Sequence, residues 1–413
     1  MATKMIILAI ETSCDETSVA IVEAKGGLKN PSFEILSNVV LSQIKIHARW
    51  GGVVPMMAKR EHQKNLIPIF KKALIKSELL KPTTVVGSQN RHRKSVLAIL
   101  NREPELLEQF LKFIPTIKIP KIDVIAVTVG PGLEPALWVG VNFAKALATV
   151  WNKPIVGVNH MEGHVVASLL KLNLKSKISE IMQFPAIALL VSGGHTELVL
   201  IKKWGDYKIV GQTRDDAAGE CFDKTARMLE LPYPGGPQIA KQAENFKKYP
   251  LTFRIGGWTR REIEKEAFNI KLPRPMIDSK DYDFSFSGLK TAVLYMLRDM
   301  KERRVNIGDF TPMICNEIQQ AIIDVLISKT IKAAKEYDAK SIILGGGVAA
   351  NSELRLQMKK AVKDKLSSTA LYLPPAKLTT DNAAMIGAAG YLRAAKKEFI
   401  NPNKLVAQGN LGL

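Results

Sequence analysis

Two histidines four residues apart are the clearest chemical signal in this 413-residue chain. They bound the segment His160-Met-Glu-Gly-His164, which follows the apolar run Ile155–Val158. Asn159 can cap a helix here and Val165–Leu170 continue an apolar pattern, so we predict a strand, a short turn and a helix. Histidines at i and i+4 lie on one helix face, with Cβ atoms about 5–6 Å apart. This spacing lets two imidazoles share one divalent metal ion.

Glu162 separates this segment from the zinc-protease motif. In that motif the glutamate follows the first histidine directly, whereas Glu162 stands two residues after His160, about 200° around the helix. A general base must share the histidine face, so a metalloprotease is not predicted. The alternative to a metal site is a hydrogen-bonded pair of helix histidines. Metal ligation is favoured because these are two of only six histidines in the chain.

Asp381 is the best isolated carboxylate for a third metal ligand. It lies in Thr379-Thr-Asp-Asn382, directly before an expected helix over Ala383–Lys396. An aspartate at this place more often caps the helix than binds a metal, so the sequence leaves both roles open. Two neutral imidazoles and one carboxylate would leave open positions on a metal for a substrate.

A strand, a polar turn and a second strand occur twice along the chain. The first copy is Ile6–Ile10, Glu11–Thr17 and Ser18–Val22, and the second is Ala186–Val191, Ser192–Thr196 and Glu197–Ile201. At a constant offset of 179 residues, Ser13 aligns with Ser192 and Thr17 with Thr196. We interpret this as a duplication of two α/β halves, each opening with a hairpin whose turn can face a phosphate. The alternative is two unrelated hairpins.

Glycine turns follow other expected strands. Gly130-Pro-Gly-Leu133 and Gly345–Gly347 each come after a buried-strand run and before an expected helix, the second from about Asn351. Backbone N–H groups in such a loop can hold a phosphate or an adenosine. Asp223, expected on a helix, and a glycine turn at Gly236 are together suited to hydrogen-bonding a ribose.

The composition is that of a globular protein with an excess of positive charge. Hydrophobic residues make up 46% and charged residues 24%, which are ordinary values. The net charge of +20 favours a polyanionic partner such as nucleic acid, the alternative being a host whose proteins are generally basic. Cys14, Cys221 and Cys315 form no CxxC pair, which indicates a reducing compartment. No secretory signal or membrane span is recognisable, and we expect a cytoplasmic protein.

Two stretches look like basic additions to the α/β halves. Residues 76–121 contain Arg91-His-Arg-Lys94 and an expected helix near Leu97–Phe113, and residues 241–271 contain Arg254, Arg260 and Arg261. The first stretch is a candidate RNA-contacting surface through Arg91, Arg93 and Lys94, the alternative being a solvated face. We predict a lobe at residues 1–184 and a second at 185–413, with the chain end packed back on the first.

Ten segments in one order along nearly the whole chain carry a resemblance to a known family. They are Ile10-Glu-Thr-Ser-Cys-Asp-Glu-Thr17, His47 with Gly51-Gly-Val-Val-Pro55, Gly130-Pro-Gly-Leu133, His160-Met-Glu-Gly-His164, Ser192-Gly-Gly-His-Thr196, Asp215-Asp-Ala-Ala-Gly-Glu220, Tyr233-Pro-Gly-Gly-Pro237, Phe286-Ser-Gly-Leu-Lys-Thr291, Gly346-Gly-Val-Ala-Ala-Asn351 and Thr380-Asp-Asn-Ala-Ala384. Together they closely resemble the tRNA N(6)-adenosine threonylcarbamoyltransferase family of the TsaD type. The resemblance implies a duplicated α/β fold of the actin, sugar-kinase and Hsp70 type (ASKHA), with two lobes around a central cleft.

The resemblance also implies an activity and its residues. The family transfers the threonylcarbamoyl group of threonylcarbamoyl-AMP to the exocyclic amine of the adenosine 3′ of the anticodon, in tRNAs that read codons beginning with adenine. It implies one divalent metal ion, Fe²⁺ before Zn²⁺, on His160, His164 and Asp381, and catalysis by Asp15 and Glu16. The residues implied to bind the adenylate are Leu190, Val191, Ser192, Gly193, Gly194, Asp223, Gly236 and Asn351.

The resemblance also implies partner subunits, and the sequence differs from the family pattern at two positions. The resemblance implies a paralogous dimerisation subunit and an ATPase subunit of a bacterial modification complex, and the chain itself has no GxxxxGK[ST] motif. Met56 and Ala240 stand where the family commonly has acidic residues, and Ala240 removes one ribose contact. A sugar kinase would fit the duplicated fold but not the histidine pair, and a non-catalytic nucleotide-binding scaffold would not need the metal triad.

Overall fold

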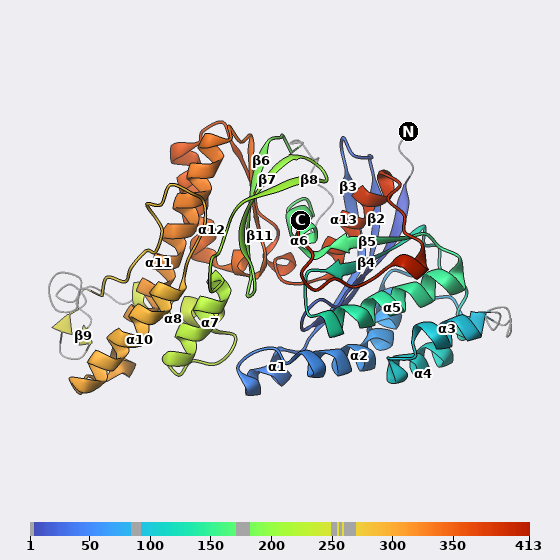
Figure 1. Cartoon of the computed structure of the whole chain (residues 1–413), viewed down its shortest axis with the longest axis horizontal. Helices are drawn as coiled ribbons and strands as arrows, with labels where there is room; N and C mark the ends of the chain where they lie inside the picture. The colour runs from blue at the N-terminus through green and yellow to red at the C-terminus, as the bar shows by residue number, and fades with distance from the viewer. Residues whose placement is uncertain (1–3, 84–91, 171–181, 249–253, 256–257, 260–269) are drawn as a thin grey trace. The chain divides into compact units, whose positions relative to one another are not determined.

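The chain folds into two compact units in a computed structural model that describes residues 4–83, 92–170, 182–248, 254–255, 258–259 and 270–413. Contacts assign Met1–Ile181 and Pro374–Leu413 to unit 1 and Met182–Leu373 to unit 2 (Figure 1). The chain end therefore belongs by its contacts to the N-terminal unit. The lobe boundary between residues 184 and 185 stays a prediction.

Unit 1 is built on a five-stranded mixed sheet with the order β3-β2-β1-β4-β5. Its strands are β1 (Met5–Glu11), β2 (Glu16–Lys25), β3 (Ser32–Ser42), β4 (Val124–Gly130) and β5 (Ile155–Asn159). The first three form an antiparallel meander, and β4 and β5 add in parallel beside β1. The parallel strands are buried apolar runs because helices cover the sheet.

Unit 2 repeats this connectivity with the order β12-β11-β6-β7-β8. Its strands are β6 (Ala186–Val191), β7 (Thr196–Lys203), β8 (Asp206–Gln212), β11 (Ser341–Gly345) and β12 (Ala370–Tyr372). Even the hairpin register is repeated. The pair Ile10↔Val19 of the first hairpin becomes Leu189↔Leu198 in the second, at the 179-residue offset that the sequence shows. The predicted duplication and the ASKHA fold class are confirmed.

The helices of unit 1 cover both faces of its sheet. They are α1 (Ile44–His47), α2 (Pro55–Lys76), α3 (Arg93–Ile99), α4 (Pro104–Phe113), α5 (Glu134–Trp151), α6 (His160–Ala167) and α13 (Ala383–Ala395). Leu8 and Ile10 join the core formed with α2 to α5, whereas Ala9 on the opposite face lies against α13. The helix predicted near Leu97–Phe113 is two helices, because Pro104 begins a new one at N1.

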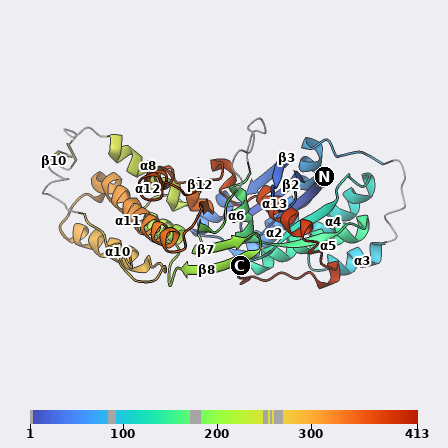
Figure 2. The same ribbon diagram turned by 90° about the horizontal axis from the view of Figure 1, so that it is seen from above.

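Unit 2 carries the helices α7 (Ala218–Met228), α8 (Gly235–Lys248), α10 (Ser287–Glu302), α11 (Ile307–Glu336) and α12 (Ser352–Lys365), which gather around α11 (Figure 2). The helix α11 begins at Ile307, because Asn306 caps it by accepting a hydrogen bond from Gly308 N at 3.2 Å. A two-residue ladder joins β9 (Arg254–Ile255) to β10 (Trp258–Thr259).

Three of the basic residues singled out in the sequence, Arg91, Arg260 and Arg261, lie outside the described residues. Arg93 and Lys94 are exposed at the start of α3. No helix within the described ranges is both long and apolar enough to cross a membrane.

Two glycines let α13 lie close to the unit 1 sheet. A Cβ added at Gly390 would lie 2.5 Å from Cβ of Ala126 on β4, and one at Gly387 would lie 2.8 Å from Cγ2 of Val22 on β2. Both distances are below van der Waals contact, so the helix would have to move away from the sheet. Since α13 directly follows Asp381, such a movement would also displace that carboxylate.

Gly390→Ala should therefore destabilise the protein despite the better helix propensity of alanine. Overpacking costs about 1–3 kcal/mol, and the propensity gain returns about 1 kcal/mol. The matched control is Gly308→Ala, because its Cβ would meet only Asn306 Oδ1 at 3.4 Å. Urea unfolding midpoints measure both variants. A Gly390→Ala protein as stable as its parent would contradict the tight packing.

Candidate metal centre

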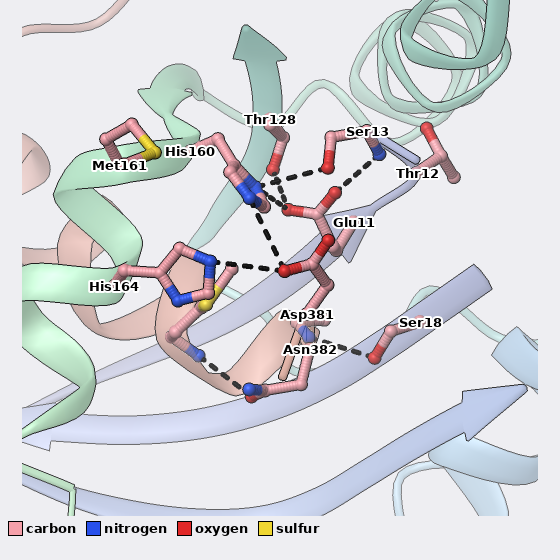
Figure 3. Close-up of polar contacts among 12 residues, drawn as sticks. Glu11, Thr12, Ser13, Ser18, Thr128, His160, Met161, His164, Asp381 and Asn382 are labelled. Atoms are coloured by element: carbon pink, nitrogen blue, oxygen red, sulfur yellow. Dashed lines mark hydrogen bonds and ion pairs between the residues drawn. The ribbon is translucent and has the colours of Figure 1, made fainter. Parts of the chain in front are cut away.

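The two histidines lie on α6, as their spacing predicts. Asn159 caps this helix, with its Oδ1 accepting hydrogen bonds from Met161 N at 2.8 Å and Glu162 N at 3.3 Å. The cap begins the helix at His160, which places the rings of His160 and His164 4.7 Å apart between centroids and nearly perpendicular (Figure 3). Both side chains are buried, and both face the same point in unit 1.

Asp381 approaches both histidines from the other end of the chain. Its Oδ1 lies 3.1 Å from Nε2 of His164 and 3.4 Å from Nε2 of His160 (Figure 3). One ligand atom from each of the three residues lies within 4.8 Å of the others. The structure thus brings together the three predicted metal ligands.

Asn382 decides between the two roles that the sequence left open for Asp381. The side chain of Asn382 caps α13 by accepting a hydrogen bond from Met385 N at 3.2 Å. The capping position is therefore occupied by the neighbouring residue, and the carboxylate of Asp381 points at the histidines instead. A ligand role fits this geometry better than a capping role.

Carboxylates gather around the two histidines of the triad. Glu11, Asp15 and Glu16 are buried near Asp381, and within the described part of the chain none of the four pairs with a lysine or arginine. Burial, followed by the charges of Asp381 and Asp15, raises the pKa of Glu16 to about 10. A bound cation would relieve this repulsion, so the site suits a divalent metal.

The pKa values of His160 and Asp381 also reflect the surrounding charges. Burial opposes the charged form of His160, but the charges of Asp381 and Glu11 outweigh it and raise its pKa. Burial likewise opposes the ionised form of Asp381, and the charge of His160 nevertheless lowers its pKa. Nδ1 of His164 is buried and has no hydrogen-bond partner among the described residues. Hydrogen bonding alone therefore does not satisfy this ring.

Glu11 holds the other side of the His160 ring. Its Oε2 lies 3.2 Å from Nδ1 of His160 and accepts a hydrogen bond from Oγ1 of Thr128 at 2.6 Å, while its Oε1 accepts one from Ser13 N (Figure 3). A carboxylate behind a histidine in this way fixes the ring orientation for metal binding. Sequence reasoning assigned Glu11 no role, because no spacing rule joins residues 149 positions apart.

His62, also without a predicted role, supports the turn that carries Asp15 and Glu16. Its Nε2 lies 2.9 Å from the carbonyl oxygen of Cys14, and its Nδ1 lies 2.8 Å from Oγ1 of Thr17. A carbonyl only accepts, so Nε2 carries the proton and Nδ1 accepts from the threonine hydroxyl. Burial lowers the pKa of His62 to about 4, which keeps the ring neutral in this arrangement.

Glu162 forms an ion pair away from the triad. Its Oε2 lies 2.7 Å from Nε of Arg393 on α13. This buried carboxylate therefore ties α6 to α13, as its position off the histidine face suggested, and it is not placed as the general base of a metalloprotease.

The predicted adenylate-binding residues lie in unit 2, and Leu190–Gly194 among them lie at the carboxyl end of β6. Leu190 and Val191 are fully buried in β6, whereas Gly193 and Gly194 are exposed in the turn that follows, and a Cβ on either would meet nothing within 4 Å. The carbonyl of Ser192 accepts a hydrogen bond from Gly219 N at 3.2 Å, which joins this turn to α7. Ligands commonly bind at this edge of an α/β sheet.

Asp223 and Asn351 are both engaged in helix caps. Oδ1 of Asp223 accepts a hydrogen bond from Gly235 N at 2.6 Å, so the carboxylate binds the start of α8, and Gly236 lies in that helix rather than in a turn. Asn351 caps α12 through Leu354 N at 2.9 Å, and its Nδ2 donates to Gln319 at 2.8 Å. The expected glycine turn at Gly236 is thus a helix start.

The sequence model of the tRNA N6-adenosine threonylcarbamoyltransferase family (TsaD) matches residues 34–85 and 100–388 of this chain. The protein of that name from Thermosipho africanus is 42% identical over 409 residues, covering 98% of this chain and 99% of its own length. Its namesake from Bacillus subtilis is 42% identical over 392 residues, covering 95% of this chain and 91% of its own length. The chain therefore belongs to this family, and the resemblance seen in the sequence is confirmed.

Two solved structures show more distant likeness. A ROK family protein from Streptococcus pneumoniae is 14% identical with a TM-score of 0.37, covering 95% of this chain and all of its own. HypF from T. kodakarensis is 12% identical with a TM-score of 0.40, covering 73% of this chain and 44% of its own.

The family match also shows how far the two predicted basic additions lie outside the family model. Only residues 86–99 of the predicted insertion fall between its two segments, and residues 241–271 lie inside it.

Asp381→Asn should remove metal binding while leaving stability nearly unchanged, because it keeps the shape of the side chain and the cap on Asn382. The matched control is Asn382→Ala, which should lose about 1 kcal/mol of stability through the missing cap and keep its metal. Metal content after dialysis and urea unfolding are measured on both. If Asp381→Asn retained metal like its parent, the third ligand would have to be sought elsewhere.

Glu11→Gln should weaken metal binding by about 10- to 100-fold, since such an outer carboxylate orients the ligating histidine. The amide cannot accept at both oxygen positions, and one end would face a donor. Competition with a chelator of known affinity measures the change. Unaltered metal affinity would show that His160 is held without Glu11.

Proposed function

We propose that this chain modifies tRNA by transferring a threonylcarbamoyl group to adenosine, with a divalent metal on His160, His164 and Asp381. The family membership supports the reaction. The observation that carries the metal is the convergence of the three side chains to within 4.8 Å inside an otherwise acidic cluster. We propose Fe²⁺ before Zn²⁺, because two histidines and one carboxylate with open positions suit ferrous iron, and zinc also accepts this donor set.

The substrates and partners follow from this reaction. We propose threonylcarbamoyl-AMP as the donor and the adenosine 3′ of the anticodon as the acceptor, in tRNAs reading codons that begin with adenine. A paralogous dimerisation subunit and an ATPase subunit are the proposed protein partners. Because its nucleic-acid substrate is there, we place the enzyme in the cytoplasm. The net charge of +20 suits a polyanionic substrate.

The chemistry joins an amine to an activated carbonyl. The donor is a mixed anhydride of a carbamic acid and AMP, so no covalent enzyme intermediate is needed. The exocyclic nitrogen of adenosine forms a bond to the carbamoyl carbon, the bond from that carbon to the phosphate oxygen breaks, and AMP leaves with the electron pair. When bound, the metal supplies Lewis acidity for the threonylcarbamoyl group. The amine must also lose a proton.

Asp15 and Glu16 are proposed to handle that proton. Burial raises the pKa of Glu16, and we propose that its carboxyl holds a proton and donates a hydrogen bond. We assign proton acceptance to Asp15, whose backbone is held by a hydrogen bond from Gln43 N to its carbonyl oxygen at 2.9 Å. His62 and Thr17 hold the same turn from the other side.

The adenylate is proposed to bind along Leu190–Gly194 and near Asp223, Gly236 and Asn351. The exposed glycines of the β6–β7 turn leave backbone N–H groups for the phosphate. Asp223 and Asn351 also bind helix starts, so we expect the hydrogen-bonding capacity left on their side chains to contact the nucleoside. Met56 is exposed on α2 and Ala240 is half-buried on α8. Neither side chain carries the carboxylate that the family commonly has at that position.

His160→Ala should abolish transfer and leave the fold intact, because His160 begins a helix that Asn159 caps. Mass spectrometry of tRNA nucleosides measures threonylcarbamoyladenosine in cells that carry the parent gene, the variant or neither. Ser168→Ala is the matched control at the end of the same helix, because the Ser168 hydroxyl donates to the carbonyl oxygen of Val165 at 2.9 Å and lies outside the triad, and it should keep activity. A modified nucleoside that persists in cells lacking the gene would refute the proposed function.

A further inference from the structure

A cavity of about 380 Å³ lies in unit 1, away from the triad and from the Asp15–Glu16 turn. Its lining comes from α2, the segment joining α3 to α4, α5 and the chain end. The residues that matter for its chemistry are Lys59, Arg102, Glu103, Trp138, Asn142 and Lys145. None of them belongs to the proposed catalytic or metal-binding set, so the cavity is a separate site.

The floor of this cavity offers a hydrogen-bond acceptor without a donor. Glu103 is only 1% exposed, and its Oε2 accepts a hydrogen bond from Nδ2 of Asn142 at 3.1 Å. Its Oε1 has no hydrogen-bond partner among the described residues. Nζ of Lys59 forms an ion pair with this Oε1 at 3.8 Å, a distance too long for a hydrogen bond. A buried carboxylate oxygen in this state can accept a hydrogen bond from a hydroxyl or amino group of a ligand.

The walls carry more positive than negative charge. Lys59, Arg102 and Lys145 face a single acid, Glu103. Lys145 is half-buried, and its closest polar contact is the carbonyl oxygen of Leu405 at 3.4 Å. Within the described ranges neither Lys145 nor Arg102 pairs with a carboxylate, and burial lowers the pKa of Lys145. An ammonium that is partly removed from water without a counter-ion favours an anionic ligand.

Trp138 supplies an apolar wall. Its indole N–H lies 3.4 Å from Oε1 of Glu134 on the same helix. The polar atom of this side chain is therefore directed to its own helix, and what it offers to a ligand is the ring. An aromatic ring beside cations is the usual platform for an unstacked base, because every base has a face that can stack.

We propose that this cavity binds one unpaired ribonucleotide of the tRNA substrate. The cations hold its phosphate, Oε1 of Glu103 accepts a hydrogen bond from its ribose hydroxyl, and its base stacks on Trp138. A ribonucleotide is the ligand class that presents an anion, a hydroxyl donor and a flat ring together. The inference rests on the proposed function insofar as tRNA is the substrate.

The rim of the cavity favours a nucleotide within an RNA strand over a free nucleotide. Ala98, Asn101, Arg102 and Asn403 line it and are exposed, so the bound unit can continue into solvent as a polymer must. Part of the cavity lining lies outside the family model, because Ala98 and Ile99 fall between its two matched segments.

The test measures tRNA affinity of the full chain at several salt concentrations. Trp138→Ala should weaken binding roughly 5- to 150-fold, equivalent to about 1–3 kcal/mol for one stacked base, and Trp138→Phe should restore most of it. Lys145→Ala should reduce the slope of log affinity against log salt by about 0.7–0.9 for one lost phosphate contact. The control is Lys72→Ala, at an exposed lysine of α2 outside the cavity, which should leave the slope unchanged.

Three outcomes would overturn the inference. They are a tRNA affinity and salt slope unchanged in both cavity variants, a Trp138→Phe protein as weak as Trp138→Ala, and binding of free AMP or UMP that the variants lose while tRNA binding stays intact. Metal content of each variant should equal that of the parent. Failure of the proposed function would look different, since the parent itself would then yield no modified tRNA nucleoside.

Discussion

The accumulation of carboxylates around two buried histidines is the constraint on which the rest of unit 1 depends. Glu11, Asp15, Glu16 and Asp381 come from the first hairpin and from the chain end, and electrostatic repulsion among them must be balanced within a small volume. His160 lies between Glu11 on one ring nitrogen and Asp381 on the other. A cation at the triad would turn this repulsion into attraction, which is why a metal explains the cluster better than hydrogen bonding does.

Holding Asp381 at this point requires the last part of the chain to return to the first unit. The residue is 217 positions from His164, and α13 behind it lies flat on the sheet because Gly387 and Gly390 carry no side chain. The ion pair between Glu162 and Arg393 joins α6, which carries both histidines, to α13, which follows Asp381. Packing of α13 and the position of Asp381 beside the histidines are therefore two aspects of one arrangement.

The two duplicated halves contain equivalent turns, which carry side chains of different chemistry. In unit 1 the turn after β1 carries acidic residues supported by His62 and Thr17, whereas in unit 2 the turn after β6 carries exposed glycines. The hairpin registers are the same. The difference between an acidic, metal-compatible site and an open phosphate-compatible loop thus lies in the side chains of the turns and not in the backbone that presents them.

The sequence by itself determined the local features, because they depend on residues close in the chain. The i, i+4 histidine pair, its Asn159 cap, the 179-residue repeat and the family motifs were all recognisable, and the fold class followed from them. Only the tertiary structure decided the place of Asp381 beside the histidines, the partnership of Glu11 with His160, the support of the Asp15–Glu16 turn by His62, and the cavity at Glu103. Each of these joins side chains far apart in the chain, and their contacts arise from sheet order and helix packing, which no local spacing encodes.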